Sequence, residues 1–261
     1  MQPKRILVTS GAGGVGKSSV AAHLASALAA RGRCVLLTDL CTTGRSLDLL
    51  TSLSASLLYD VGDLFCSRTD PSRVVLPVPG HKGLYLLPGA FRSERAPTLP
   101  ELTRAIRAAE EAIHAEYTVF DAHLDPLALR AMTISDKTLL VTDASPSSLR
   151  ATAEAALTLP TKTEASVIIN RFPCYPDVKT EIPAVKPWLD EIRLPLIGIL
   201  PDSLTLSARE AVGDGVSFPR ENLSIAYAAV AARLEGECAP LCRGWRKLRI
   251  KRKRLIRKLI G

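Results

Sequence analysis

SGAGGVGKSS, residues 10–19, is the stretch that decides the fold, because it sets a glycine-rich loop between a predicted strand and a predicted helix. Residues 11–18 fit the P-loop pattern G-x-x-x-x-G-K-[ST]. The glycines let backbone amides converge on phosphate oxygens, and the following helix adds its positive N-terminal end. The stretch therefore predicts a site for ATP with Mg²⁺, with Lys17 at the β and γ phosphates and Ser18 on the ion.

Short apolar runs alternate with longer amphipathic stretches along most of the chain. The short runs are mostly continuous, as in strands that are covered on both faces. This alternation predicts an α/β fold with a single doubly wound, mainly parallel sheet and helices on both faces. The predicted strands are Arg5–Ser10, Cys34–Asp39, Leu84–Leu87, Tyr117–Asp121, Thr138–Thr142, Ser166–Asn170 and Leu196–Leu200. The predicted helices are Ser19–Arg31, Leu99–Ala115, Ser147–Leu159 and Asn222–Leu234, and the Pro-rich segment Ser67–Pro79 is predicted to be a surface loop.

Composition and charge indicate one cytoplasmic domain with a distinct tail. The chain has 261 residues, of which 47% are hydrophobic, enough for one large core, and no apolar stretch reaches the roughly 18 to 20 residues that span a bilayer. Six scattered cysteines lack paired CxxC spacing and are expected to be reduced thiols. Residues 243–261 hold ten Lys or Arg and no acid, so the net charge of +8 leaves 8 − 10 = −2 for the remainder. We expect an ATPase domain over 1–237, a linker over 238–244 and a helix over 245–261.

Two carboxylates end predicted strands where a phosphate site needs them. Asp39 ends the second strand and Asp121 ends the run YTVFD. Both would face the nucleotide if their strands are parallel neighbours of the first. Asp121 is then a natural Walker-B residue that holds magnesium directly or through water. We assign Lys17, Asp39 and Asp121 as catalytic residues and Ser18, Asp39 and Asp121 as metal ligands. The alternative is that each Asp only caps a strand end.

The P-loop stretch and four other segments resemble the MinD/ParA family of deviant Walker-A P-loop ATPases, and its MinD branch most. SGAGGVGKSS is similar to the family's SGKGGVGKTT, and LLTDLCTTGRSLDLL at 36–50 is similar to its second-strand segment. SPSSLRA at 145–151 is similar to the family's segment with two serines, a small apolar residue and arginine, and VIINR at 167–171 and GILPDS at 198–203 are weaker matches to its stretches around the adenine.

The resemblance implies an ATP-switched protein that forms a face-to-face homodimer with ATP at the interface and acts in division-site placement with a regulator that the sequence does not identify. Asn170 would read the adenine and Pro201 would border it, although Asn170 could also be an ordinary strand-end residue. The expected nucleotide-binding residues are Gly11, Gly13, Gly14, Val15, Gly16, Lys17, Ser18, Ser19, Asn170, Pro201 and Asp202.

Three departures from the family pattern fall on the chemistry. Ala12 replaces the signature lysine that neutralises the partner's phosphates, and Cys41 replaces the second carboxylate of D-x-D. The family's D-x-P-A-G reads DAHLD at 121–125. These changes predict a protein that binds nucleotide but hydrolyses it slowly or not at all, either as a slow ATPase or as a non-hydrolysing scaffold. His123 or Asp125 as a replacement base remains an alternative.

The tail GWRKLRIKRKRLIRKLIG combines an apolar stripe with dense positive charge. This is the pattern of a helix that lies in an anionic membrane interface, which predicts attachment to the cytoplasmic face of the cell membrane through anionic lipids. Ten cations also suit nucleic acid, as in a ParA-like DNA-segregation protein, but the apolar stripe then has no role. The stripe consists of Trp245, Leu248, Leu255, Ile256, Leu259 and Ile260.

Overall fold

One sheet of eight strands, in the order β3-β4-β2-β5-β1-β6-β7-β8, organises the described part of the chain. This computed structural model describes residues 2–91, 95–173, 186–211, 216 and 222–241. All neighbouring strands are parallel except β3 and β4, which are antiparallel. The strands are β1 (Lys4–Thr9), β2 (Val35–Asp39), β3 (Leu76–Pro77), β4 (Leu84–Leu87), β5 (Tyr117–Asp121), β6 (Lys137–Thr142), β7 (Ala165–Phe172) and β8 (Leu196–Pro201).

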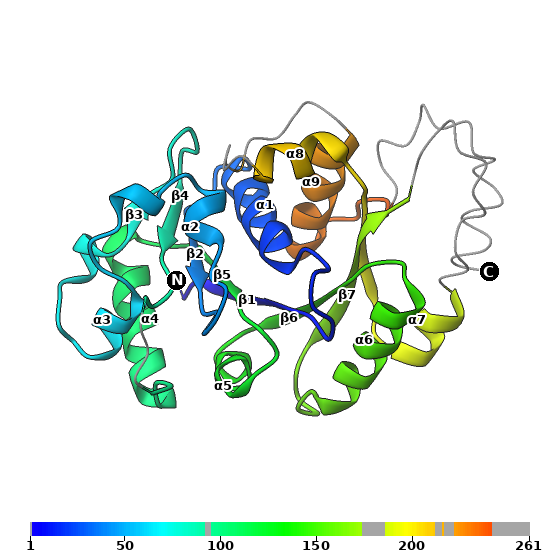
Figure 1. Cartoon of the computed structure of the whole chain (residues 1–261), viewed down its shortest axis with the longest axis horizontal. Coiled ribbons are helices and arrows are strands. Elements are labelled where there is room, and N and C mark those ends of the chain that lie inside the picture. The colour runs from blue at the N-terminus through cyan, green and yellow to red at the C-terminus, as the bar shows by residue number, and fades with distance from the viewer. Residues whose placement is uncertain (1, 92–94, 174–185, 212–215, 217–221, 242–261) are drawn as a thin grey trace.

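Helices cover both faces of the sheet (Figure 1). On one face, α1 and α9 pack side by side over the central strands, with α2 and α8 nearby, and the other face carries α3 to α7. Because both faces are covered, β2 and β5 are buried at every position. The helices are α1 (Lys17–Ala29), α2 (Leu47–Leu50), α3 (Val61–Phe65), α4 (Leu99–Ile113), α5 (Pro126–Thr133), α6 (Pro146–Thr158), α7 (Lys186–Ile192), α8 (Leu204–Ala211) and α9 (Asn222–Leu234), with short 3-10 turns at Ser54–Ser56 and Pro71–Arg73.

The predicted fold class is confirmed, and the predicted strands and helices lie within two residues of the observed bounds. The predicted surface loop Ser67–Pro79 is wrong in part. It contains β3 and a 3-10 turn, and its valines Val74, Val75 and Val78 are buried. The reason is packing, because the 3-10 turn lies against α4, where Val74 and Val75 join the core, and Val78 joins the core on the other face of the sheet.

The C-terminal predictions fall largely outside the described residues. Residues 238–241 of the predicted linker form neither helix nor strand, and the predicted tail helix over 245–261, with its six apolar residues, lies beyond them. Among the described residues no helix combines the length and hydropathy needed to cross a bilayer.

Candidate phosphate and metal site

The loop between β1 and α1 has the backbone conformation that its glycines predict. Gly16 adopts a left-handed conformation with φ of 84°, which L side chains rarely adopt, and α1 begins at the next residue, Lys17. The Asn170 amide lies against the same turn, where it donates to the Val15 carbonyl at 2.9 Å. A Cβ added at Gly16 would lie 2.5 Å from that amide nitrogen. The end of β7 therefore supports the loop.

The start of the loop is pressed against α6. A Cβ at Gly11 would overlap the carbonyl oxygen of Ala151 and approach Ala155 to 2.9 Å. The next side chain, Ala12, is partly buried and packs against the core. The loop is thus held from two sides, by α6 and by β7, while Gly13 and Gly14 at its tip are exposed.

Lys17 reaches inward from the loop to the carboxyl ends of the central strands. Its ammonium forms an ion pair with Asp121, lies 3.3 Å from Cys41 Sγ and lies 3.4 Å from Ser18 Oγ. The Lys17 and Asp121 side chains are 7% and 0% exposed. Burial opposes the charge on Lys17, but the attraction of Asp121, helped by Cys41, raises the pKa of Lys17. The predicted phosphate-binding lysine is therefore charged and paired with the Asp121 carboxylate.

Asp39 lies directly beside Asp121 in the sheet register. Both carboxylates would lie on strands next to β1 in the arrangement considered from the sequence. In the structure only β5 is a neighbour of β1, and β2 lies one strand further out. The Asp39 carboxylate accepts from the Cys41 N–H at 2.9 Å and from the N–H groups of Ser46 and Leu47 at 3.3 and 3.4 Å. Burial and the Asp121 carboxylate raise the pKa of Asp39 to about 6.

Cys41 completes a compact set of metal-type donors. One donor atom from each of Asp39, Cys41 and Asp121 lies within 4.8 Å of the other two, and all three residues are buried. Burial and the two carboxylates raise the pKa of the Cys41 thiol, which is therefore protonated at neutral pH. Oxygen donors from Ser18, Asp39 and Asp121 suit Mg²⁺, and the Lys17 ammonium already stands among them as a cation. The residues present fit the predicted metal.

Side-chain hydrogen bonds connect the residues that follow Asp121 to neighbouring segments. Asp125 is the N-cap of α5 and accepts from Leu127 and Ala128 N–H at 2.8 and 2.9 Å. The His123 ring nitrogen lies 3.0 Å from the Thr43 carbonyl oxygen, and His123 is exposed. The carboxylate that was an alternative base thus has a helix-capping role in this structure.

Two residues that the sequence analysis did not single out flank the loop. Arg171 Nη1 donates to the Gly14 carbonyl oxygen at 2.8 Å, and the Glu210 carboxylate accepts from the Ser19 hydroxyl. Arg171 directly follows Asn170, which the sequence analysis had assigned to the nucleotide site, and this position could have identified it. Glu210 lies on α8, 191 positions from Ser19, and the sequence carried no signal for that contact.

Pro201 and Asp202, predicted to border the base, end β8 beside β7. Pro201 pairs with Phe172, and the Asp202 N–H donates to the Phe172 carbonyl at 2.9 Å. The side chain of Asn170 contacts the loop, whereas Pro201 and Asp202 contact Phe172 of β7. The nucleotide-binding assignment of these three residues stays a prediction.

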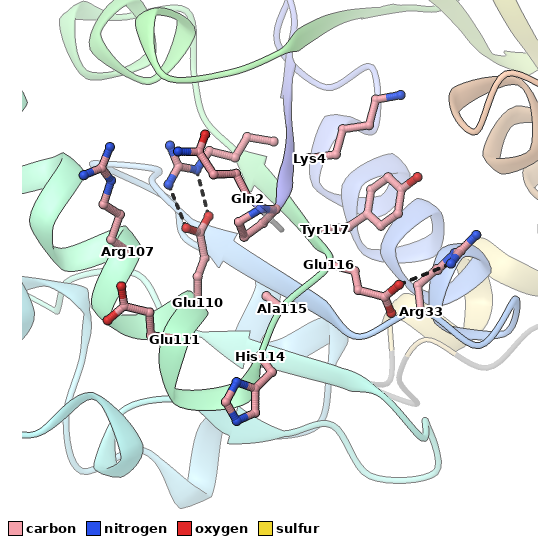
Figure 2. A pocket seen from close by; sticks show the side chains of 12 residues that line it. Gln2, Lys4, Arg33, Arg107, Glu110, Glu111, His114, Ala115, Glu116 and Tyr117 are labelled. Atoms are coloured by element: carbon pink, nitrogen blue, oxygen red, sulfur yellow. Dashed lines mark hydrogen bonds and ion pairs between the residues drawn. The ribbon is translucent and has the colours of Figure 1, made fainter.

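A separate pocket of about 760 Å³ lies at the amino ends of β1 and β5, the end of the sheet opposite the P-loop (Figure 2). Several of its charges are paired with one another: Arg5 donates to both oxygens of Glu110 at 2.8 and 2.7 Å, and Arg33 lies 3.2 Å from Glu116. These pairs join β1 to α4 and the segment before β2 to that before β5. The pairs connect segments at the amino ends of the central strands, and the pocket lies at the opposite end of the sheet from Lys17, Asp39 and Asp121.

Comparisons with known proteins agree with this geometry. The ParA family model, described as "NUBPL iron-transfer P-loop NTPase", matches residues 2–75. The septum site-determining protein MinD of Synechocystis sp. is 29% identical over 243 residues, which cover 90% of each chain. Among solved structures, the MinC:MinD cell division protein complex of Aquifex aeolicus matches with a TM-score of 0.76 and 25% identity over 92% of this chain and 99% of that one. The Pyrococcus horikoshii MinD complexed with Mg-ADP matches with a TM-score of 0.70 and 23% identity over 90% and 96%.

Proposed function

Because the chain is a P-loop NTPase of the ParA/MinD family, we propose that it is a MinD-like ATP-binding protein that takes part in placing the division septum. The observation that carries the proposal is the buried cluster of Lys17, Asp39 and Asp121 at the end of the P-loop. The near full-length similarity to MinD proteins supports the cellular role.

Nucleotide binding exchanges the partners of Lys17. In the ligand-free site its ammonium neutralises Asp121. The triphosphate offers more negative charge within reach of the same lysine, so Lys17 turns to the phosphates while the loop amides and the start of α1 hold their oxygens. Ser18, Asp121 and Asp39 would hold a magnesium ion, which would supply positive charge at the phosphate oxygens. The Mg-ADP complex of the Pyrococcus relative supports this cofactor pair.

The test of this step is the affinity for a fluorescent ATP analogue with Mg²⁺. We expect wild-type protein to bind it and Lys17→Ala to lose binding, with Lys137→Ala, a surface lysine paired with Glu164, as the control. Equal binding by the wild type and Lys17→Ala would refute a P-loop role for this lysine.

We further propose that residues 245–261 attach the protein to the inner face of the membrane and that ATP promotes a homodimer. The support is the apolar stripe of this segment together with its nine Lys and Arg residues, which Arg243 just before it brings to ten. Flotation of the full chain and of a form ending at 242 with anionic vesicles tests the attachment. Equal flotation of both forms contradicts it, and salt-sensitive retention of duplex DNA without flotation would favour a DNA-segregation role. Sedimentation of the ATP and ADP forms tests the dimer.

The partner proposed is a division-site regulator, since the Aquifex relative is a MinC:MinD complex. The start of α6 differs from the family here, because Ala151 stands where MinD has an acidic residue in its partner surface. We therefore propose that the regulator contacts this helix differently. Pull-down of a MinC-type protein by the ATP form, compared with the ADP form, tests the partnership.

A second candidate function is a nucleotide-binding scaffold without a hydrolytic cycle. Ala12 packs against the core instead of presenting a cation, and Cys41 offers a neutral thiol where a carboxylate would orient water. If these residues limit the reaction, Ala12→Lys with Cys41→Asp will raise ATP turnover about 100-fold or more. Wild-type turnover that Lys17→Ala abolishes would rule out the scaffold.

A further inference from the structure

The Lys17 ammonium marks a cation position that is built from mixed donors. It contacts a hydroxyl of Ser18, the thiol of Cys41 and a carboxylate oxygen of Asp121. A positive charge is therefore already accommodated at the point where these three chemically different groups meet. A sulfur atom belongs to that set as closely as the hydroxyl oxygen does.

When nucleotide binds, the Lys17 ammonium leaves this position. Once Lys17 turns to the phosphates, Asp121 and Asp39 are two adjacent buried carboxylates, 0% and 1% exposed, without the ammonium. Two like charges buried side by side are strongly unfavourable. A second cation has to take over the position that the ammonium leaves.

The remaining donors are spaced for a single ion. Metal–donor bonds of about 2.0–2.5 Å place two ligands of one ion at most about 5 Å apart, and the donor atoms of Asp39, Cys41 and Asp121 lie within 4.8 Å of one another. Cys41 is held there by its own backbone, whose N–H donates to Asp39. Its Sγ lies 3.7 Å from Asp121 Oδ2. Asp39 and Cys41 also line a pocket of about 250 Å³ together with Thr42.

We propose that Cys41 is a ligand of the nucleotide-associated divalent ion and shifts its selectivity from Mg²⁺ towards thiophilic ions such as Zn²⁺ and Co²⁺. Magnesium prefers oxygen ligands, whereas Co²⁺, Zn²⁺ and Cd²⁺ accept thiolate. On binding, a sulfur–metal bond forms and the thiol proton passes to solvent. This inference rests on the proposed function, because ATP is what draws Lys17 away.

Cobalt provides a direct readout of sulfur ligation. Full-length protein is titrated with Co²⁺ in the presence of a non-hydrolysable ATP analogue, and the near-ultraviolet thiolate-to-cobalt charge-transfer band is recorded. We expect the band in the wild type and in Cys34→Ser, which removes a half-buried thiol outside the site, and its loss in Cys41→Ser. A band of equal intensity in Cys41→Ser, or no band in the wild type with the analogue bound, overturns the proposal.

Selectivity gives a second measure. The ratio of the Mg²⁺ to the Co²⁺ concentration that half-saturates analogue binding should fall by about tenfold or more in Cys41→Ser and Cys41→Asp relative to the wild type. An unchanged ratio in both variants contradicts sulfur ligation.

Failure of the proposed function is distinguishable from failure of this inference. If no ion supports analogue binding, ATP binding itself is refuted. Lys17→Ala then vacates the cation position without nucleotide, and a cobalt band in Lys17→Ala that disappears in Lys17→Ala with Cys41→Ser still supports Cys41 as a ligand. Absence of that band overturns it.

Discussion

Lys17 and Asp121, 104 positions apart in the chain, form a buried ion pair at the carboxyl ends of the central strands. The lysine that a P-loop uses for phosphate is thus the counter-ion of the predicted metal ligand in the ligand-free protein. Neither charge is exposed to solvent, so each depends on the other for neutralisation.

This dependence predicts a large stability effect at Lys17. Lys17→Ala leaves Asp121 uncompensated beside Asp39 and should lower the free energy of unfolding by about 3–5 kcal/mol, measured by urea denaturation without ligand. Lys137→Ala breaks a pair with Glu164, which is 69% exposed, and should cost at most about 1 kcal/mol. Similar small losses in both variants would contradict the buried pair.

The raised pKa of Asp39 predicts a pH dependence of stability. Between its ordinary value near 4 and its folded value of about 6, the folded state holds the proton and the unfolded state does not. Stability from this group is therefore lost as pH rises through that window, by about 3 kcal/mol for two pH units. Asp39→Asn should lack this loss. As pH rises from 4 to 6, the difference in unfolding free energy between the variant and the wild type should therefore shift in favour of the variant. Parallel curves for the two proteins would contradict the assignment.

The contact between Glu210 and Ser19 predicts that α8 opposes nucleotide binding. The Glu210 carboxylate holds the hydroxyl of a predicted phosphate-binding residue and adds negative charge at the same place. Glu210→Gln should keep an acceptor for Ser19 and tighten ATP-analogue binding by about tenfold at low salt, less as ionic strength rises. Glu164→Gln, a carboxylate on the surface, is the control and should leave the affinity unchanged. A weaker affinity of Glu210→Gln would show that the carboxylate assists binding.

The close approach of the loop to α6 predicts that an added methyl group lowers the free energy of unfolding at Gly11 but not at Gly13. Gly11→Ala sets a methyl group against the Ala151 carbonyl and should cost about 1–3 kcal/mol of unfolding free energy. Gly13→Ala meets nothing within 4 Å and should change stability by less than about 0.5 kcal/mol. Thermal unfolding of the ligand-free proteins separates the two, and equal losses would mean that α6 does not restrain the loop.

The fold was predictable because its strands are continuous apolar runs and its P-loop has the correct flanks. Short elements were not, since α2 and α3 have only four and five residues, too few to establish a periodicity. The valines at 74, 75 and 78 were misread because nearby prolines outweighed them, although Val74 and Val75 pack in the core with α4 and Val78 packs in the core with α1.

The site was predictable as a set of residues but not as an arrangement. Lys17, Asp39 and Asp121 follow from strand ends and the loop motif. Their mutual contacts depend on the strand order, which the sequence analysis did not establish. The contact of Ser19 with α8 depends on packing between segments nearly two hundred positions apart, which no local pattern encodes.

The position of β5 between β1 and β2 has a consequence for how the protein is made. The P-loop and Asp39 both lie in the first 39 residues, yet their strands β1 and β2 are joined in the sheet only through β5, Tyr117–Asp121, which lies between them. A nascent chain that has emerged only to the end of β4 therefore carries the loop motif without a sheet to support it. β1 and β2 can therefore take their places in one sheet only after the ribosome has delivered β5, the strand that joins them.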